Sequence, residues 1–464
     1  MKGMKSSIEI LTADEILMIH RAALNVLEKT GFHLPNDECL NRCVRAGALV
    51  DRQKSVVRIP VSGMEDLLAE MKRQAGGLNE QTPFLAGSIS TQVFVTDYMS
   101  KTRRYGSSDD ILRGISLLGH LKNIPSCNAV TVPADVDPRI SDLHAYGLLM
   151  KYSAKPGGTY ILSAATAEYI MDIGEAMGRK EYYLFESVSP LRFRKETLEI
   201  GLRFADRGHG LSIAPMIMGG TTGPATMAGT MTLIVAEVLA SIFTVHAISG
   251  QLIAFFGHGS HFNDPRTLLC SFGSPNQALI GIGTAQMAKF YGIPCGSNSA
   301  LSDALMPDFQ CGFEKTFSAV MSGLAGTVSI GCQGIAGADQ GFSFEQLVLD
   351  NEWLDAWNYV VSGIEVNEET IARELIHEVG IGGNFIAEEH TAGHIRENWW
   401  PSKVFFRDSY DAWQNAGKKD ALDRAHELVE NLTINYRNPD LVIPAAKANE
   451  LDRIQAKALT AILK

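Results

Sequence analysis

Several features that assign a protein to a class at once are absent from this sequence. Its 464 residues include seven cysteines, an odd number without a Cys-x-x-Cys pair, which fits reduced thiols better than a disulfide framework. There is no Gly-x-Ser-x-Gly nucleophile elbow, no Gly-x-Gly-x-x-Gly dinucleotide motif and no lysine after a glycine-rich phosphate loop. The net charge of −11 argues against a surface for nucleic acids or anionic membranes.

Long apolar runs are also scarce. The N-terminus shows no signal peptide, and the most apolar stretch, residues 227–248, is interrupted by Glu237 and His246. This stretch therefore predicts a buried helix and not a membrane span. We expect a soluble, cytoplasmic protein that binds neither membranes nor nucleic acids.

The order of the apolar segments predicts an α/β fold. Residues 1–87 show amphipathic helical patterns, the first introduced by a Thr-x-x-Glu capping box. Residues 88–363 open with a hairpin pattern and then alternate strand and helix about eight times, the number that closes a TIM (β/α)8 barrel. Two of the expected strands are NAVTVPA at 128–134 and GTYILSA at 158–164. Residues 364–464 are helical and charged, and we expect a C-terminal helical cap packed on the barrel.

Side chains at the carboxyl ends of the predicted strands form the candidate site, because barrel enzymes bind their substrates there. The candidate substrate-binding residues are Tyr160, Phe185, Glu186, Phe255, Phe256, His258, His261, Asp303 and Gln333. Aromatic faces beside a carboxylate suit a quaternary ammonium ion, which has no N–H to donate and binds through cation–π and Coulomb attraction. The alternative, that these rings only fill the layers of the barrel, stays open at this point.

A glycine-rich segment joins one predicted strand to the long apolar helix. Its backbone amides, at a helix N-terminus, suit an anion, and a tight connection without a ligand is an equal alternative. Pro224 fits the first helical turn, with Thr221, Thr222 or Gly223 as the expected cap. The expected mouth of the barrel consists of Gly219, Gly220, Thr221, Thr222, Gly223, Asn298 and Ser302.

The histidines indicate no complete metal site. His258 and His261 are spaced as joint ligands but lack a third ligand at a suitable spacing, so we expect no metal, with zinc as an alternative. His390 and His394 lie four residues apart, which fits either a metal pair or packing on one helix face. No serine nucleophile or strand-end lysine accompanies them, so no residue is assigned as an acid, a base or a nucleophile.

Similarity to one known family extends over nearly the whole chain. It is carried by GGTTGPATMAGTMTLIVAEVLA, GSNSALSDALMPDFQCGFEK, QLVLDNEWLDAW and the C-terminal HTAGHIRENWWPSKVFFRDSYDAWQNAGKKDALDRAHE. These segments resemble the trimethylamine methyltransferases, the MttB-like proteins. The resemblance implies a TIM barrel and methyl transfer from an amine to the cobalt of a separate corrinoid protein. The founding enzymes carry pyrrolysine in the barrel mouth, whereas every position here is an ordinary residue.

This departure implies a quaternary amine as methyl donor, with glycine betaine, which would yield dimethylglycine, as the first expectation. The acceptor implied is Co(I) of the partner corrinoid protein (cobalamin-type), with no tightly bound cofactor and no acid or base needed for the displacement. We also expect a homo-oligomer. The expected partners of a donor carboxylate are His258, His261, Arg192 or the amides of the glycine-rich segment. Two alternatives stay open: a metal-dependent barrel methyltransferase, and a non-catalytic member that binds betaines or a corrinoid protein.

Overall fold

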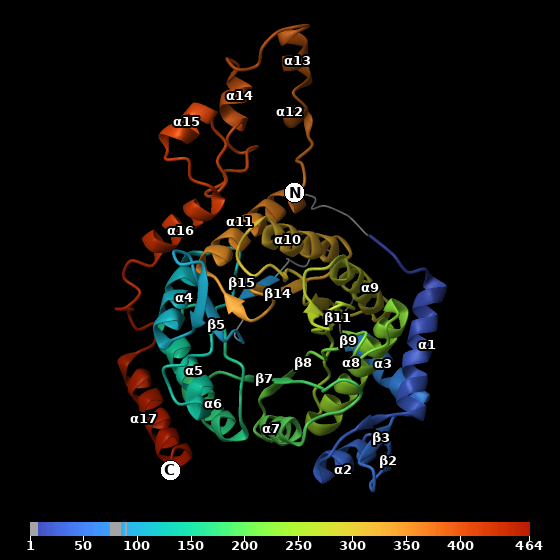
Figure 1. Ribbon diagram of the computed structural model, residues 1–464. Coiled ribbons are helices and arrows are strands. Elements are labelled where there is room, and N and C mark those ends of the chain that lie inside the picture. Colours follow the sequence, from blue (N-terminus) through green and yellow to red (C-terminus); the bar gives the residue numbers. More distant parts are fainter. Residues whose placement is uncertain (1–7, 75–84, 89–90) are drawn as a thin grey trace.

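The computed structural model describes residues 8–74, 85–88 and 91–464, and a ring of helices dominates it (Figure 1). Each helix of the ring contacts the next one along the chain. The ring consists of α4 (Ser108–His120), α5 (Ser141–Tyr152), α6 (Ala164–Met177), α7 (Lys195–Asp206), α8 (Met227–Ser249), α9 (Pro275–Tyr291), α10 (Phe309–Leu324) and α11 (Phe344–Val361). Helix α16 (Ala421–Leu432) contacts both α11 and α4, so it lies between the last and the first helix of the ring. All the ring helices match helices expected from the sequence.

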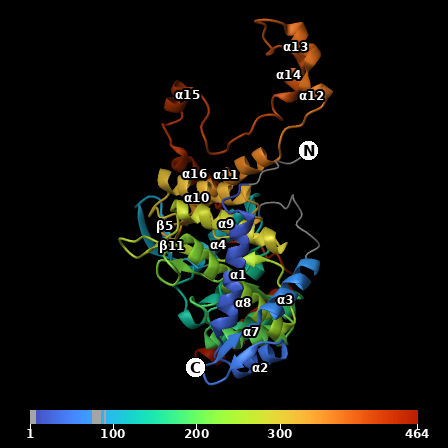
Figure 2. The same ribbon diagram turned by 90° about the vertical axis from the view of Figure 1, so that its right-hand side faces the viewer.

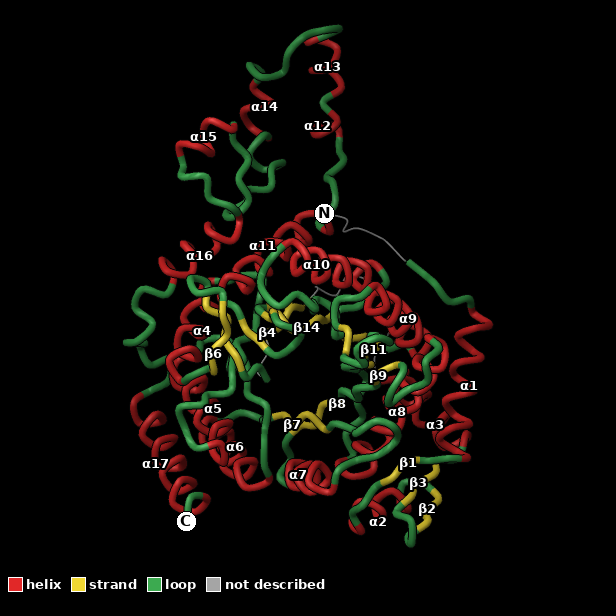
Figure 3. The backbone as a smooth tube through the Cα atoms, in the orientation of Figure 1, coloured by secondary structure: helices red, strands yellow, loops and turns green. Residues whose placement is uncertain are grey.

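Short parallel strands lie inside the ring (Figure 3). One sheet has the order β10 (Phe256–Gly257), β13 (Cys295–Ser297), β14 (Ser329–Gln333), β4 (Leu85–Ser88), and a second pairs β7 (Tyr182–Phe185) with β8 (Gly210–Ile213). The strand region before the first ring helix thus pairs with the strand before the last. The chain is an α/β protein, and its described strands form separate sheets and not one continuous ladder.

Two expected strands, 128–134 and 158–164, carry no strand ladder. The segments do lie side by side, because the Ala129 amide donates to the Gly158 carbonyl at 3.2 Å. Pro133 has no N–H to contribute to a ladder, and the prolines and glycines around these segments weaken regular pairing. The expectation of regular strands is therefore wrong at these two positions.

Two further sheets, of four and three strands, mix parallel and antiparallel pairs. The first joins β5 (Phe94–Asp97) and β6 (Thr102–Tyr105), which form the expected antiparallel hairpin, to β15 (Ile335–Ala336) and β16 (Gly341–Phe342). The second contains β9 (Met218–Gly219), β11 (His261–Asn263) and β12 (Cys270–Ser271). These sheets hold the segments that follow β8, β10 and β14, where many of the candidate residues lie.

The N-terminal segment covers the outer face of α8. Helix α1 (Ala13–Lys29), which begins with the expected capping box, α2 (Asp37–Arg45) and α3 (Val61–Gln74) all contact α8. A small sheet of β1 (Phe32–His33), β2 (Leu49–Asp51) and β3 (Val56–Arg58) completes the segment. Among the described helices, α8 alone is long and apolar enough to cross a membrane, yet 78% of its most apolar window is buried inside the protein. It is the core helix that the sequence predicts.

The C-terminal region lies on the body only in part. Helices α16 and α17 (Ala445–Ile462) pack against it, α17 on α5 and α6. Residues 364–403, called the arm below, project away from the ring with α12 (Glu368–Ile371), α13 (Arg373–Val379) and α14 (Glu389–His394) (Figures 1 and 2). Helix α15 (Tyr410–Asn415) follows the arm. No side chain of the arm is buried, and its C-terminal end contacts the body, where the Trp400 indole N–H donates to Asp355 of α11 at 3.1 Å. The expected packing of the cap on the barrel is therefore seen at this end and not along most of the arm.

Candidate functional site

The predicted aromatic residues divide between the two faces of their strands. Phe185 is fully buried and its ring centroid lies 5.1 Å from that of Phe193, while Phe256 is fully buried and stacks on Tyr291 of α9 at 6.2 Å. Both rings point toward the helices and fill the core, so their expected role in a substrate cage is wrong. Neighbouring residues on a strand face opposite sides, which places Phe255 on the inward face.

Phe255 occupies space that glycines leave open. A Cβ added to Gly296 would lie 2.6 Å from the Phe255 Cζ atom, and one added to Gly257 would lie 3.3 Å from its Cε1 atom. The half-buried ring therefore covers the adjacent strands β10 and β13 where no side chain competes with it.

Tyr160 and Glu186 come together as one pair. The Tyr160 hydroxyl donates to the Glu186 carboxylate, and both side chains are half-buried. Glu186 follows Phe185, which faces the helices, so alternation places the carboxylate on the inward face. Burial raises the pKa of the Glu186 carboxyl above its ordinary value, while the Tyr160 hydrogen bond opposes this rise. The pair joins an aromatic ring to a carboxylate, a combination that attracts cations.

His258 is a buried packing residue. Its Nε2 lies 3.0 Å from the Thr284 hydroxyl, which itself donates to the Ile280 carbonyl, so Nε2 carries the hydrogen. Its Nδ1 accepts the Ser260 amide at 3.2 Å. Burial lowers the pKa of His258 to about 3, so the ring is neutral at physiological pH. With both nitrogens engaged and no charge, His258 is not available to a donor carboxylate.

His261 lies in a buried chain of polar side chains. Its Nδ1 is 2.8 Å from the Gln277 carbonyl oxygen, and its Nε2 accepts the Asn298 amide at 2.9 Å. Asn298 in turn accepts the Cys332 thiol at 2.9 Å. The chain links β11, α9 and the ends of β13 and β14, and burial lowers the pKa of His261 to about 4. The structure thus unites the predicted His261 and Asn298 with Gln277 and Cys332, for which the sequence carries no signal.

Asp303 and Ser302 hold a loop in place. The Asp303 carboxylate accepts the Ser271 hydroxyl at 2.7 Å and the Phe272 and Gly273 amides at 2.6 and 3.2 Å. The Ser302 hydroxyl donates to Glu314 at 2.7 Å. Because their polar atoms are used within the protein, both residues shape the region after β13 without offering a free group to a substrate.

The glycine-rich segment 219–223 forms a turn closed on itself. The Thr221 and Gly223 amides both donate to the Met218 carbonyl at 3.0 Å, and the Gly220 amide donates to the Gly223 carbonyl at 3.1 Å. These three amides are unavailable to an anion. The turn lies before the helix and is not part of its first turn, because α8 begins at Met227 with Thr226 as its N-cap. The expected caps Thr221, Thr222 and Gly223 are therefore wrong.

A strained segment begins within β14 at Cys332 and continues into the turn after the strand, and a buried ion pair contacts it. Positive φ angles occur at Cys332 (77°), Ala338 (51°) and Asp339 (61°), a conformation that costs energy in residues other than glycine and concentrates at functional sites. The ammonium of Lys315 on α10 lies 3.0 Å from the Cys332 carbonyl and 3.1 Å from the Asp350 carboxylate. Both side chains are fully buried. A lysine inside the apolar pattern of α10 is the one sequence signal for this contact.

Two further polar residues lie near this turn. Gln333 is fully buried, and its amide donates to the Gly331 carbonyl at 2.8 Å while its Oε1 atom has no partner among the described residues. An unpaired buried acceptor is unusual and marks a place for a ligand or water. The Asp339 carboxylate accepts the Gln92 amide at 3.1 Å, and burial raises its pKa to about 6. Asp339 was missed in the sequence, where it stands between glycines in AGADQG.

Replacing Asp339 with asparagine is expected to stabilise the protein, most strongly above the pKa of Asp339. Because that pKa of about 6 exceeds the ordinary value, protonation favours the folded state, and this stabilisation is lost as the pH rises through about 6. The gain in unfolding free energy should shrink by about 1 kcal/mol between about pH 7.5 and about pH 5. Urea unfolding at both pH values measures it, with the exposed Asp66→Asn as control; a gain independent of pH would contradict the assignment.

The metal alternative finds no complete ligand set. No group of three or more His, Cys, Asp or Glu side chains in the described residues is placed to hold a metal ion. All four ring nitrogens of His258 and His261 have protein partners. His390 and His394 do share a face of α14, with ring centroids 4.3 Å apart. The Nε2 atom of His394 lies 3.6 Å from the Oε1 atom of Glu369.

Of the remaining candidates, Arg192 is exposed and bridges through its backbone to His33 of the N-terminal sheet. All seven cysteines are free thiols. Two of the predicted site residues, Tyr160 and Glu186, are hydrogen-bonded to each other, and Phe255 lies against β10 and β13.

Comparison with known proteins gives the family. A family model described as trimethylamine methyltransferase (MTTB) matches residues 1–458, and the chain belongs to this family. A glycine betaine methyltransferase of Desulfitobacterium hafniense is 27% identical over 93% of this chain and 94% of its own. A trimethylamine methyltransferase MttB of the same species is 26% identical over 91% and 89%, and MttB1 of Methanosarcina mazei is 28% identical over 92% and 91%.

Among solved structures, the monomethylamine methyltransferase (MtmB) of Methanosarcina barkeri matches with a TM-score of 0.46 and 11% identity, over 90% of this chain and 92% of that one. The family model confirms the resemblance inferred from sequence motifs. The protein is a methyltransferase of the MttB family.

Proposed function

We propose that this protein transfers a methyl group from a quaternary amine, glycine betaine first among them, to Co(I) of a corrinoid on a partner protein in the cytoplasm. The observation that carries the proposal is the inward Tyr160–Glu186 pair, an aromatic face joined to a carboxylate. We further propose that the ring is a TIM (β/α)8 barrel. The parallel pairing of β14 with β4 and the sequential contacts of the ring helices support it.

For this reaction the protein has to orient the substrate, bind its cationic group and exclude water. The partner's corrinoid supplies the Co(I) nucleophile that accepts the methyl group. The Glu186 carboxylate attracts the trimethylammonium group, and the Tyr160 and Phe255 rings present π faces to it. As the C–N bond breaks, its electron pair stays on nitrogen and a neutral tertiary amine leaves. No side chain has to move a proton.

The proposal of glycine betaine rests on the family and on the relative named for that substrate. Several carboxylate partners that the sequence offered are left out of the proposal. His258 is neutral and engaged, Arg192 is exposed, and three amides of segment 219–223 are bonded within their turn. The recognised group in this proposal is therefore the quaternary ammonium ion itself.

The proposal is tested with free cob(I)alamin as methyl acceptor, followed by its visible spectrum. We expect glycine betaine or another quaternary amine, such as carnitine or choline, to methylate it, and trimethylamine to be inactive. Trimethylamine turning over as fast as the best quaternary donor would contradict the proposed donor class. Binding of betaines without methylation by any donor would instead show a non-catalytic member of the family.

Replacing Phe255 with leucine should weaken donor binding by about 0.5–2 kcal/mol, the range of a cation–π contact, because leucine keeps most of the volume but no π face. The matched control is Phe256→Leu, whose ring packs on α9 in the core. This control should lower the melting temperature and leave donor affinity unchanged. Calorimetric titration with the donor measures both, and equal effects on affinity would refute the division into inward and outward rings.

A further inference from the structure

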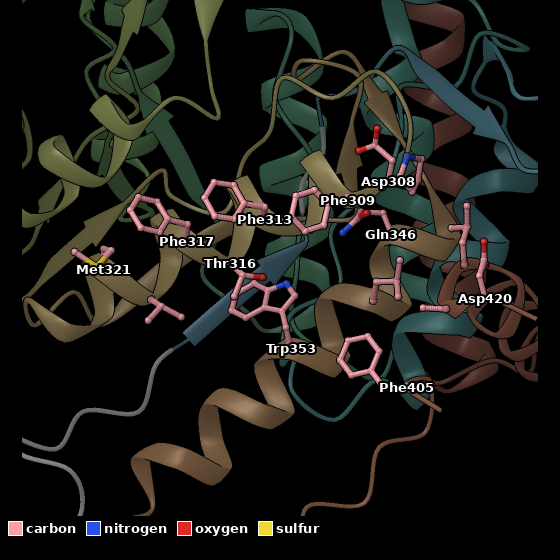
Figure 4. Close-up of a pocket in the computed structure, with 16 residues that line it drawn as sticks. Asp308, Phe309, Phe313, Thr316, Phe317, Met321, Gln346, Trp353, Phe405 and Asp420 are labelled. Atoms are coloured by element: carbon pink, nitrogen blue, oxygen red, sulfur yellow. The ribbon is translucent and has the colours of Figure 1, made fainter. Parts of the chain in front are cut away.

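An apolar groove lies outside the ring, between α10, α11 and the start of α16 (Figure 4). Its volume is about 920 Å³. Phe309, Phe313 and Phe317, spaced four residues apart on α10, form a stacked row along it, with centroids 6.2 and 5.5 Å apart. Phe309 is 87% exposed and Phe313 is 53% exposed. Exposed phenylalanines in a continuous row are unusual on a protein in water and indicate an interaction surface.

The base of the groove is formed by aromatic side chains. Figure 4 shows Trp353 of α11 below the phenylalanine row, with Phe405 beyond it. Trp353 is buried, and its indole N–H donates to Asp350 at 3.0 Å, which holds the ring in place. The groove is therefore a preformed apolar surface that suits an apolar segment.

The arm, residues 364–403, also leaves apolar side chains exposed. None of its residues is buried, although it is rich in large apolar side chains. Those exposed are Ile364, Val366, Ile371, Ile376, Ile381, Phe385, Ile386, Ile395 and Trp399. Its helices have four, seven and six residues, and helices this short are not stable in water without packing. The apolar composition is also unlike that of a disordered linker. The arm therefore needs a surface that its own chain does not supply in this structure.

We propose that the arm of one chain packs into the phenylalanine groove of a second copy, so that the protein is a homo-oligomer held by arm exchange. Both surfaces belong to the same chain, and both are apolar and uncovered in the single copy. In Figures 1 and 2 the arm projects away from α10, which directs it outward toward another molecule. Reciprocal exchange closes a dimer, and head-to-tail exchange closes a larger ring. The inference goes beyond the proposed function and does not depend on it.

Sedimentation equilibrium of the full-length protein tests the proposal with two charge substitutions. Phe313→Glu alters the groove and Ile381→Glu alters the arm, and both positions are more than half exposed, so the body should fold and melt as in the wild type. Each variant should raise the dissociation constant at least ~100-fold, because a carboxylate would be buried without a partner. The control Met18→Glu, on an exposed position of α1, should sediment as the wild type does.

Mixing the two variants provides the decisive measurement. The Phe313→Glu chain keeps an intact arm and the Ile381→Glu chain keeps an intact groove, so one productive contact forms between them. The mixture should contain a two-chain species that neither variant forms alone. The proposal is overturned if the wild type sediments as a monomer, if either variant keeps the wild-type assembly, or if the mixture stays monomeric. A monomeric wild type would leave the groove to a different protein.

Discussion

Replacing Glu186 with glutamine is expected to lower kcat/KM for glycine betaine about 100-fold, or roughly 3 kcal/mol of transition-state binding. Glutamine keeps the volume and an acceptor for the Tyr160 hydroxyl, but it removes the charge that faces the substrate cation in a half-buried site. Steady-state methylation of cob(I)alamin over a range of donor concentrations measures the loss. Because the cation is bound before and during the reaction, most of the loss should appear in KM.

The pH dependence provides a second readout of the same carboxylate. Burial raises the pKa of Glu186, so the charged form that attracts the donor is lost as the pH falls through this raised value. The wild type should lose donor affinity at a pH above the ordinary titration range of glutamate, and Glu186→Gln should not show this step. The matched control is Glu196→Gln, an exposed glutamate on α7. If Glu186→Gln and the control behave alike, the cation lies elsewhere.

Replacing Lys315 with methionine is expected to lower the free energy of unfolding by about 3–5 kcal/mol, the usual cost of leaving one member of a buried ion pair alone. Methionine has nearly the length of lysine, so the loss is not due to a cavity. The Asp350 carboxylate would stay fully buried without its cation, and the Cys332 carbonyl would lose its donor. Urea unfolding measures the change.

The double variant Lys315→Met, Asp350→Asn separates the ion pair from packing. It removes both charges and should recover part of the lost stability, since a buried pair is worth less than the cost of breaking it. Lys195→Met, on an exposed position of α7, should change stability by less than about 0.5 kcal/mol. A loss below about 1 kcal/mol for Lys315→Met would show that the turn after β14 does not depend on this pair.

The helices of the ring follow from local sequence. Segments rich in apolar, helix-forming residues mark α4 to α11, the capping box at Thr12 starts α1, and Gly250 and Gly292 end α8 and α9 in left-handed conformations. These patterns extend over only a few residues, so the helices can be predicted without knowledge of tertiary contacts. Where a proline interrupts the pattern, as in 128–134, the same local rules placed a strand where the structure has none.

Local sequence does not show which face of a strand points inward. Phe255 and Phe256 are chemically alike and adjacent, and a shift of one residue in register exchanges inside for outside. Only the packing of Phe256 on Tyr291 decides which ring faces inward. Likewise, the spacing of His258 and His261 is compatible with a metal site, and only Thr284, Ser260, Gln277 and Asn298 show that their nitrogens are already engaged.

By itself, the sequence determined the α/β class, the order of the ring helices, the buried character of α8 and, through long motifs, the family. Tertiary structure alone decided which predicted site residues lie together, that Lys315 and Asp350 pair, and that no side chain of the arm is buried. Helix formation depends on neighbours three or four residues away, whereas a site depends on contacts between residues up to hundreds of positions apart. Those contacts are set by the packing of the whole chain and leave no periodic trace in the sequence.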